Sequence, residues 1–89
     1  MIIVSQWNNI IANFDNITSL DIDRSNGRYI VECNFTNKNN IYLGEYVTEE
    51  RAKEVLQEII KSYRHYRTAE CDGYTNVLEE TAVFEMPKE

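Results

Sequence analysis

The sequence predicts a single α+β domain, in which a curled antiparallel sheet of five or six strands packs against one long helix. Three observations support this prediction. One stretch carries a helical apolar stripe, several short β-branched runs bounded by turn residues precede it, and one more run follows it near the C-terminus. Because a helix with one apolar stripe needs another element to cover it, the strands are expected to form a sheet beneath it.

The first strands are predicted from two β-branched runs, residues 2–6 and 10–14, which form a hairpin around a polar turn at residues 7–9. Asp15 and Asn16 then interrupt the pattern as a turn or a bulge, because both side chains readily bond to local backbone. Residues 17–23 alternate between apolar and polar side chains, which is typical of a half-buried strand.

Asn26-Gly27 is the clearest turn signal, since both residues accept the positive φ that a type I′ hairpin needs. The strand at residues 28–36 follows, and its core face is expected to include Cys33. A turn at residues 37–40 leads to a strand at residues 41–46, in which Gly44 indicates a bulge or a close backbone approach.

The helix is predicted from apolar residues spaced three and four apart, opposite a charged face. The stripe consists of Ala52, Val55, Leu56, Ile59, Ile60 and Tyr63. Thr48 is the expected N-cap, because its hydroxyl can accept a hydrogen bond from the first turn. The pattern leaves the end of the helix open after Tyr63, since no Gly or Pro occurs before Gly73.

After the helix, residues 68–76 lack periodicity and are predicted as a loop. A last strand is expected within residues 77–86, most clearly at 81–86, and Pro87 ends it. The sum is a small barrel-like sheet closed by a late helix, as in pleckstrin-homology-like domains. This comparison concerns the fold alone and predicts no activity.

Composition excludes several classes of function. The formal charge of −6 argues against a protein that binds duplex nucleic acid, which would present a basic face to phosphate. The sequence contains no run of about 18 apolar residues, so it predicts no membrane-spanning helix. The N-terminal residues do not resemble a signal peptide. The expectation is a cytoplasmic protein whose two cysteines form no disulfide framework.

No pattern predicts catalysis, a cofactor or a metal site. His65 is the single histidine, and the sequence places no nucleophile or carboxylate beside it. Asp21 and Asp23 share a strand face and could hold a hard cation, but a solvated strand face before a turn is the favoured explanation. Cys71 lies between two acids, which disfavour its thiolate. We therefore expect a protein that is not an enzyme.

Cations and aromatic residues alternate around the predicted end of the helix. The candidate ligand-binding residues are Lys61, Arg64, Tyr66, Arg67 and Tyr74. Arginines three residues apart can grip one phosphate while a tyrosine stacks on a base, so a nucleotide or another anionic ligand would fit. In the alternative interpretation, the basic residues only complement the helix dipole.

Three aromatic residues are candidates for a protein interface. Trp7 lies in a predicted turn, and Tyr42 and Tyr46 are expected on the outer face of their strand. Exposed aromatic side chains commonly anchor interfaces, although burial in the core would explain these residues as well. Free sheet edges would also allow the chain to form a homo-oligomer.

Four stretches together resemble one protein family and cover most of the chain. They are residues 3–6 (IVSQ), 13–20 (NFDNITSL), 43–59 (LGEYVTEERAKEVLQEI) and 84–87 (FEMP). The family consists of small uncharacterised proteins encoded by phages and prophages of low-GC Gram-positive bacteria. The resemblance implies a phage accessory protein that acts in the host cytoplasm by binding, without catalysis.

Two functions follow as expectations. The first is a binding module that modulates a host or defence protein. The second is an anti-defence sponge that sequesters a nucleotide or another anionic ligand at the basic, aromatic end of the helix.

Overall fold

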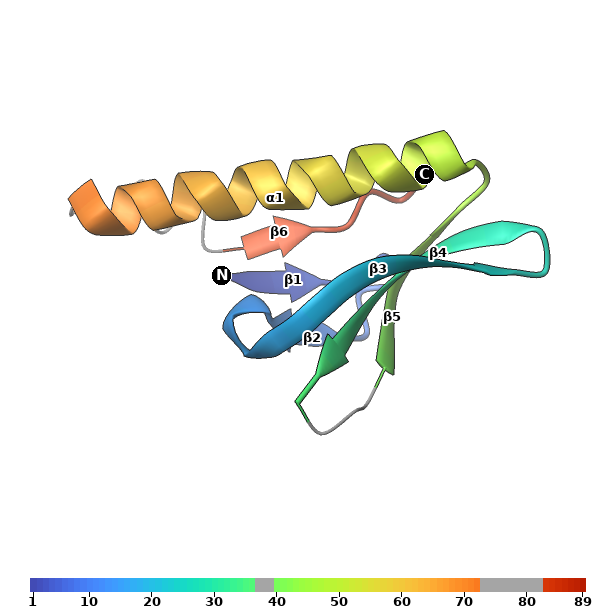
Figure 1. Ribbon diagram of the computed structural model, residues 1–89, viewed down its shortest axis with the longest axis horizontal. Helices are drawn as coiled ribbons and strands as arrows, with labels where there is room; N and C mark the ends of the chain where they lie inside the picture. Colours follow the sequence, from blue (N-terminus) through green and yellow to red (C-terminus); the bar gives the residue numbers. More distant parts are fainter. Residues whose placement is uncertain (37–39, 73–82) are drawn as a thin grey trace.

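The computed structural model describes residues 1–36, 40–72 and 83–89, with side chains up to residue 66 in the helix. Two three-stranded sheets and one long helix enclose the core (Figure 1). The elements in chain order are β1 (Ile2–Val4), β2 (Ile11–Asn13), a 3₁₀ turn (Phe14–Asn16), β3 (Ile17–Ser25), β4 (Arg28–Phe35), β5 (Asn40–Tyr46), α1 (Glu49–Asp72) and β6 (Val83–Glu85).

The predicted α+β class, the single long helix and the strand after the helix are confirmed, but the single curled sheet is wrong. The strand orders are β2-β1-β6 and β3-β4-β5. The 3₁₀ turn separates β2 from β3, and the Asn13 side chain stabilises it by accepting a hydrogen bond from Asp15 N at 3.0 Å. β1 pairs antiparallel with β2 and parallel with β6, so the C-terminal strand completes the first sheet.

The long β3–β4 hairpin forms as predicted at its turn. Asn26 and Gly27 have φ values of 53° and 77°, which are the positive angles that a type I′ turn requires. The pairing of β4 with β5 shifts register, because Val31 pairs with Gly44 while Glu32 pairs with Tyr42. The bulge predicted at Gly44 is therefore confirmed.

Gly44 also provides the predicted close approach. A Cβ atom built at this position would lie 2.8 Å from the Tyr46 hydroxyl oxygen and 3.0 Å from its ring. The bulge changes the alternation of β5, so that the Tyr46 side chain turns inward and is only 1% exposed. The expected outward orientation of Tyr46 is therefore wrong.

Helix α1 begins as predicted, because Arg51 N donates to Thr48 Oγ1 at 3.1 Å. It continues to Asp72, so the predicted loop is wrong over residues 68–72. The physical reason is that no helix breaker precedes Gly73. The remainder of that loop, the turn at residues 37–39 and the strand predicted over residues 77–82 lie outside the described residues.

The core lies between the two sheets and α1. Its fully buried members are Ile3, Val31, Cys33, Leu43, Tyr46, Ala52, Val55 and Ile59. Of the predicted stripe, Ile60 is exposed instead. Phe14 from the 3₁₀ turn packs on Tyr63 from α1, with ring centroids 4.5 Å apart. The burial predicted for Cys33 is confirmed, and no helix among the described residues is long and apolar enough to cross a membrane.

Candidate functional site

The outer face of the β2-β1-β6 sheet is apolar. Alternation along each strand directs Ile3, Ala12 and Phe84 into the core and turns their neighbours outward. Pairing between the strands then brings these outward residues together, since Ile2 lies opposite Asn13 and Val83, and Val4 lies opposite Ile11 and Glu85. We call the four apolar residues on this side the apolar face: Ile2, Val4, Ile11 and Val83.

Solvent reaches much of the apolar face. Ile11 is 69% exposed and Val83 is 44% exposed, because both lie on strands with only one neighbour. Ile2 and Val4 lie on the central strand and are half-buried by these neighbours. Isolated exposed apolar residues are common, but four in register on one small sheet are typical of a contact surface.

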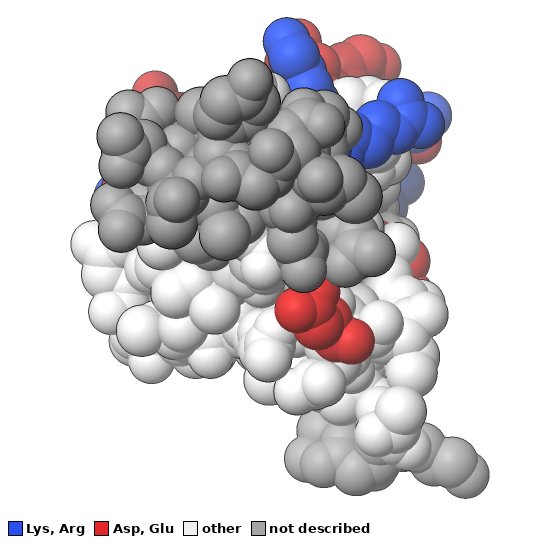
Figure 2. Space-filling view, turned by 90° about the vertical axis from the view of Figure 1, so that its left-hand side faces the viewer, with Lys and Arg blue, Asp and Glu red and all other residues white. Residues whose placement is uncertain are grey.

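The side chains beside the apolar face include two acids, Asp15 and Glu85, and the Met1 amino group lies 3.9 Å from the Asp15 carboxylate. The first 23 residues contain no Lys or Arg, and Asp15 and Glu85 lie beside β2 and within β6. Figure 2 shows this end of the molecule, where the described surface below the helix is largely uncharged and Lys and Arg side chains stand at the helix. A partner of this surface would therefore present apolar groups together with positive charge.

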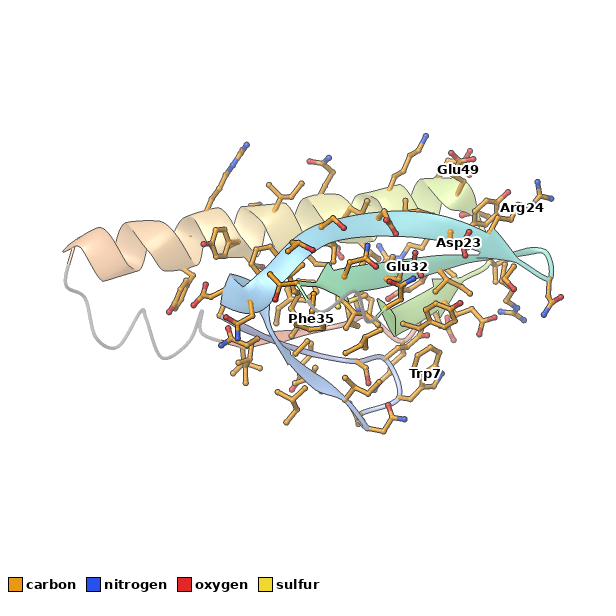
Figure 3. All side chains as sticks on the ribbon, turned by 60° about the horizontal axis from the view of Figure 1, so that its bottom comes forward. Trp7, Asp23, Arg24, Glu32, Phe35 and Glu49 are labelled. Carbon is orange, nitrogen blue, oxygen red and sulfur yellow. The ribbon has the colours of Figure 1, made fainter. Side chains whose placement is uncertain are left out.

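Trp7 projects from the turn between β1 and β2. Ser5 builds this turn, because its backbone N–H bonds to Ile10 O at 2.9 Å and its hydroxyl accepts from the backbone N–H of Asn9 and of Ile10. Trp7 is 48% exposed, as expected for an interface residue, and points away from the helix (Figure 3). Trp7 is therefore an exposed aromatic residue in the turn that joins two strands of this sheet.

The other two aromatic candidates separate. Tyr42 is about half exposed on β5, as expected, whereas Tyr46 is buried and donates from its hydroxyl to Pro87 O at 2.8 Å. The backbone N–H of Gln6 donates to Leu43 O at 2.7 Å. Trp7 follows Gln6 in the sequence and Tyr42 precedes Leu43, so each aromatic residue is next to one partner of this hydrogen bond. Tyr46 therefore contributes to the core and not to an exposed surface.

The structure does not gather the candidate ligand-binding residues on one side of α1. Lys61 and Arg64 are exposed, whereas Tyr66 is half-buried and packs against the core with Tyr63. Residues two apart on a helix point in nearly opposite directions, so Tyr66 cannot stack on a base held by Arg64. The side chain of Arg67 and all of Tyr74 lie outside the described residues.

A hollow of about 440 Å³ at the start of α1 contains three cations, each of which contacts an internal acceptor. Arg28 lies 3.9 Å from the Glu45 carboxylate. Arg51 donates to Glu89 O at 2.9 Å, and Lys88 donates to Gln6 O at 2.6 Å. This engagement makes the hollow a structural junction and a poor site for an anion.

On the outer side of the second sheet, the sequence analysis missed Glu32. This residue is 9% exposed on β4, where it lies opposite Asp21 and beside Asp23 (Figure 3). Burial, together with a hydrogen bond to Asp21 and the charges of Asp21 and Asp23, raises the pKa of Glu32 from 4.5 to about 7, and burial is the largest of these causes. Alternation within β4 could only indicate a solvated polar face, because the burial depends on neighbouring strands.

Cys33 is buried in the core and has a raised pKa. Burial raises the pKa of the Cys33 thiol to about 11, with the Glu32 charge contributing, so its thiolate is scarce at neutral pH. His65 is exposed on α1. Within the described part of the chain, no group of three His, Cys, Asp or Glu residues could hold a metal ion.

The apolar face was also missed by the sequence analysis. The available signal was that residues 2–4 and 10–12 are apolar on both sides of short strands, so that one side must face away from the core. Comparison of the chain with protein-family models, with curated proteins and with solved structures gave no match. Any functional assignment therefore depends on the geometry of these surfaces.

Proposed function

We propose that this chain is a non-enzymatic binding module and that a partner protein contacts the apolar face. The observation that carries the proposal is that four apolar side chains lie in register on the outer side of one sheet, two of them exposed (Ile11 and Val83) and two half-buried (Ile2 and Val4), and that the first 23 residues contain no Lys or Arg. Covering such a surface releases water from apolar area at about 25 cal/mol per Å². Trp7 supplies a large aromatic anchor next to the same sheet.

The resemblance to small phage proteins directs the proposal toward a host or defence protein as the partner, in the host cytoplasm. Such a role requires a stable scaffold and one complementary surface, and it needs no catalytic group. The buried core beneath the apolar face meets the first requirement, because Ile3 and Ala12 fix β1 and β2 from the inside. Modulation would then consist of covering a functional surface of the partner.

A photocrosslinking residue placed at position 11 tests this proposal. The matched control carries the same residue at Gln57, which is exposed on α1 far along the chain from the sheet. Expression in the host should give a crosslinked partner from position 11 and not from position 57. Crosslinking of the same partner with equal yield from both positions, or from neither, would refute the apolar face as the contact.

The crosslinked partner can then be used to measure affinity. Ile11→Lys should weaken its binding at least tenfold, because burying an isoleucine side chain contributes about 1.5–3 kcal/mol. Gln57→Lys adds the same charge on the helix and should change the affinity by less than about twofold. Since both positions are exposed, neither variant should lose its fold.

The second proposed function is the anti-defence sponge. It is favoured by Lys61 and Arg64, two exposed cations three residues apart on α1, where both can approach one phosphate. Tyr66 does not share their face, so stacking would have to come from elsewhere. Native mass spectrometry of protein isolated from infected cells should show a bound nucleotide that Arg64→Ala removes. Unmodified protein mass in both samples would contradict the sponge.

A further inference from the structure

We propose that the partner binds as an added strand on the free edge of β2, through an extended segment in which apolar residues alternate with others that include Lys or Arg. This inference rests on the proposed function and specifies how the partner reaches the apolar face. In such strand addition, backbone hydrogen bonds provide the register and alternate side chains provide specificity.

The hydrogen-bonding pattern of β2 leaves its outer edge open. Phe14 N donates to Met1 O and Ser5 N donates to Ile10 O, both at 2.9 Å. Because bonded and non-bonded pairs alternate in an antiparallel ladder, the N–H and C=O groups of Ile11 and Asn13 point away from β1. No hydrogen bond between described residues uses these outward backbone groups.

Among the described residues, the only usual protection of this edge against pairing is its short length of three residues. Proteins commonly block an exposed edge with charge, proline or an overlying element. β3, one of the two edge strands of the second sheet, carries Asp21, Asp23 and Arg24, whereas β2 carries no charge and no proline. On the other side of the first sheet, α1 runs above β6, which leaves β2 as the open side (Figure 1).

Side chains on an added strand would extend the apolar face. Every second residue of that strand would stand beside Ile11 on the outer side of the sheet, so these residues should be apolar. Positive charge on the segment follows from Glu85 beside the sheet, from the absence of Lys and Arg in the first 23 residues and from the net charge of −6, whereas Asp15 is already paired with the Met1 amino group at 3.9 Å. A second copy of this chain would bring the same acidic residues together, so charge disfavours it as the occupant.

Asn13 permits a matched test of backbone pairing. Its φ of −85° is close to the value that proline imposes, its N–H points outward, and its neighbour Ala12 is already in a strand. Asn13→Pro therefore removes one edge donor without breaking a bond of the β1–β2 ladder. Asn13→Ala removes the same side-chain bond to Asp15 N but keeps the donor.

The experiment begins with selection of random 12-residue peptides displayed on phage against the wild-type protein. Enriched peptides should show apolar residues at every second position and an excess of Lys and Arg. The dissociation constant of each synthetic peptide should rise at least tenfold for Asn13→Pro relative to Asn13→Ala. Two-dimensional NMR spectra of both variants confirm that the fold persists, and bound peptide should slow hydrogen exchange at the amides of Ile11 and Asn13.

The outcomes separate this inference from the proposed function. Equal affinity for the two Asn13 variants, or apolar spacing of three and four residues, would overturn strand addition. In either case, the selected peptides are also measured against Ile11→Lys. If they bind this variant more weakly than wild type, the apolar face is still the contact surface. If they bind both proteins equally, both proposals fail. Failure to enrich any peptide overturns strand addition. The crosslinking experiment at position 11 does not use these peptides, so it still tests the proposed function. A dimer in sedimentation equilibrium that only Asn13→Pro dissociates would assign the edge to a second copy and overturn the proposed partner.

Discussion

The Gln6 carboxamide pairs with the backbone of Glu45 as another strand would. Glu45 N donates to Gln6 Oε1 at 2.8 Å, and Gln6 Nε2 donates to Glu45 O at 3.1 Å. The same amide nitrogen donates to Pro87 O and Lys88 O, at 3.2 and 2.7 Å. One buried side chain therefore connects the end of β1 to β5 and to the segment after β6.

Gln6→Ala should lower the free energy of unfolding by about 2–3 kcal/mol, because it leaves a buried N–H and several carbonyl groups without their partner. Urea unfolding followed by circular dichroism measures this change. Gln57→Ala removes a glutamine that is exposed on α1 and should cost less than about 0.5 kcal/mol. Equal losses in the two variants would contradict the role assigned to Gln6.

This junction also explains how far the sequence could predict the fold. The helix and the turn at Asn26-Gly27 depend on residues close in the chain, so local periodicity and turn chemistry were sufficient. The division into two sheets depends on β1 pairing with β6, about 80 residues away, and on the bonds made by Gln6. No local pattern reports such contacts.

The candidate site shows the same limit. Exposure of Trp7 could be predicted from its polar turn, and burial of Cys33 from alternation. The orientation of Tyr46 could not, since the bulge at Gly44 reverses the alternation of β5 before that residue. The apolar face likewise requires the register of three strands that are distant in the sequence.

Gly44→Ala should destabilise the protein by about 1–3 kcal/mol, because the new methyl group would overlap the buried Tyr46 ring. In a Tyr46→Leu background the same substitution should cost much less, since the atoms it meets are absent. Thermal unfolding of the four proteins in this double-mutant cycle measures the coupling. Gly27→Ala provides the control: its φ of +77° predicts a cost of about 1 kcal/mol, which should not depend on Tyr46.

Stability should fall as the pH rises from about 4.5 to 7. The pKa of Glu32 is about 7 in the folded chain and 4.5 as the ordinary value, so the folded state binds more protons within this window. The contribution of Glu32 to the free energy of unfolding is complete below pH 4.5 and is lost as the pH rises through 7. The free energy of unfolding should fall by on the order of 2 kcal/mol over this range. Urea unfolding at several pH values measures this slope.

Glu32→Gln mimics the protonated carboxyl group and should remove most of the slope, leaving the variant more stable than wild type at pH 8. Asp21→Asn should move the loss of stability to lower pH, because it removes a charge and a hydrogen-bond partner that raise the pKa of Glu32. An unchanged slope in Glu32→Gln would assign the pH dependence to another group.

Cys33 should react with iodoacetamide only through opening of the fold. In a Cys71→Ser background at pH 8, a thiol pKa of about 11 reduces the thiolate fraction about 100-fold relative to a pKa of 9, and burial blocks access as well. Mass spectrometry should show slow labelling of native protein and rapid labelling in urea. Rapid labelling without urea would show that β4 is accessible and would contradict the packing described.

The most direct test of the central claim, that the apolar face binds a partner protein, is the affinity of the partner crosslinked at position 11 for two variants of equal charge. Isothermal titration should show binding to Ile11→Lys at least tenfold weaker than to wild type. Gln57→Lys should bind within about twofold of wild type. Equal affinity of Ile11→Lys and Gln57→Lys would contradict the claim and place the contact elsewhere on the molecule.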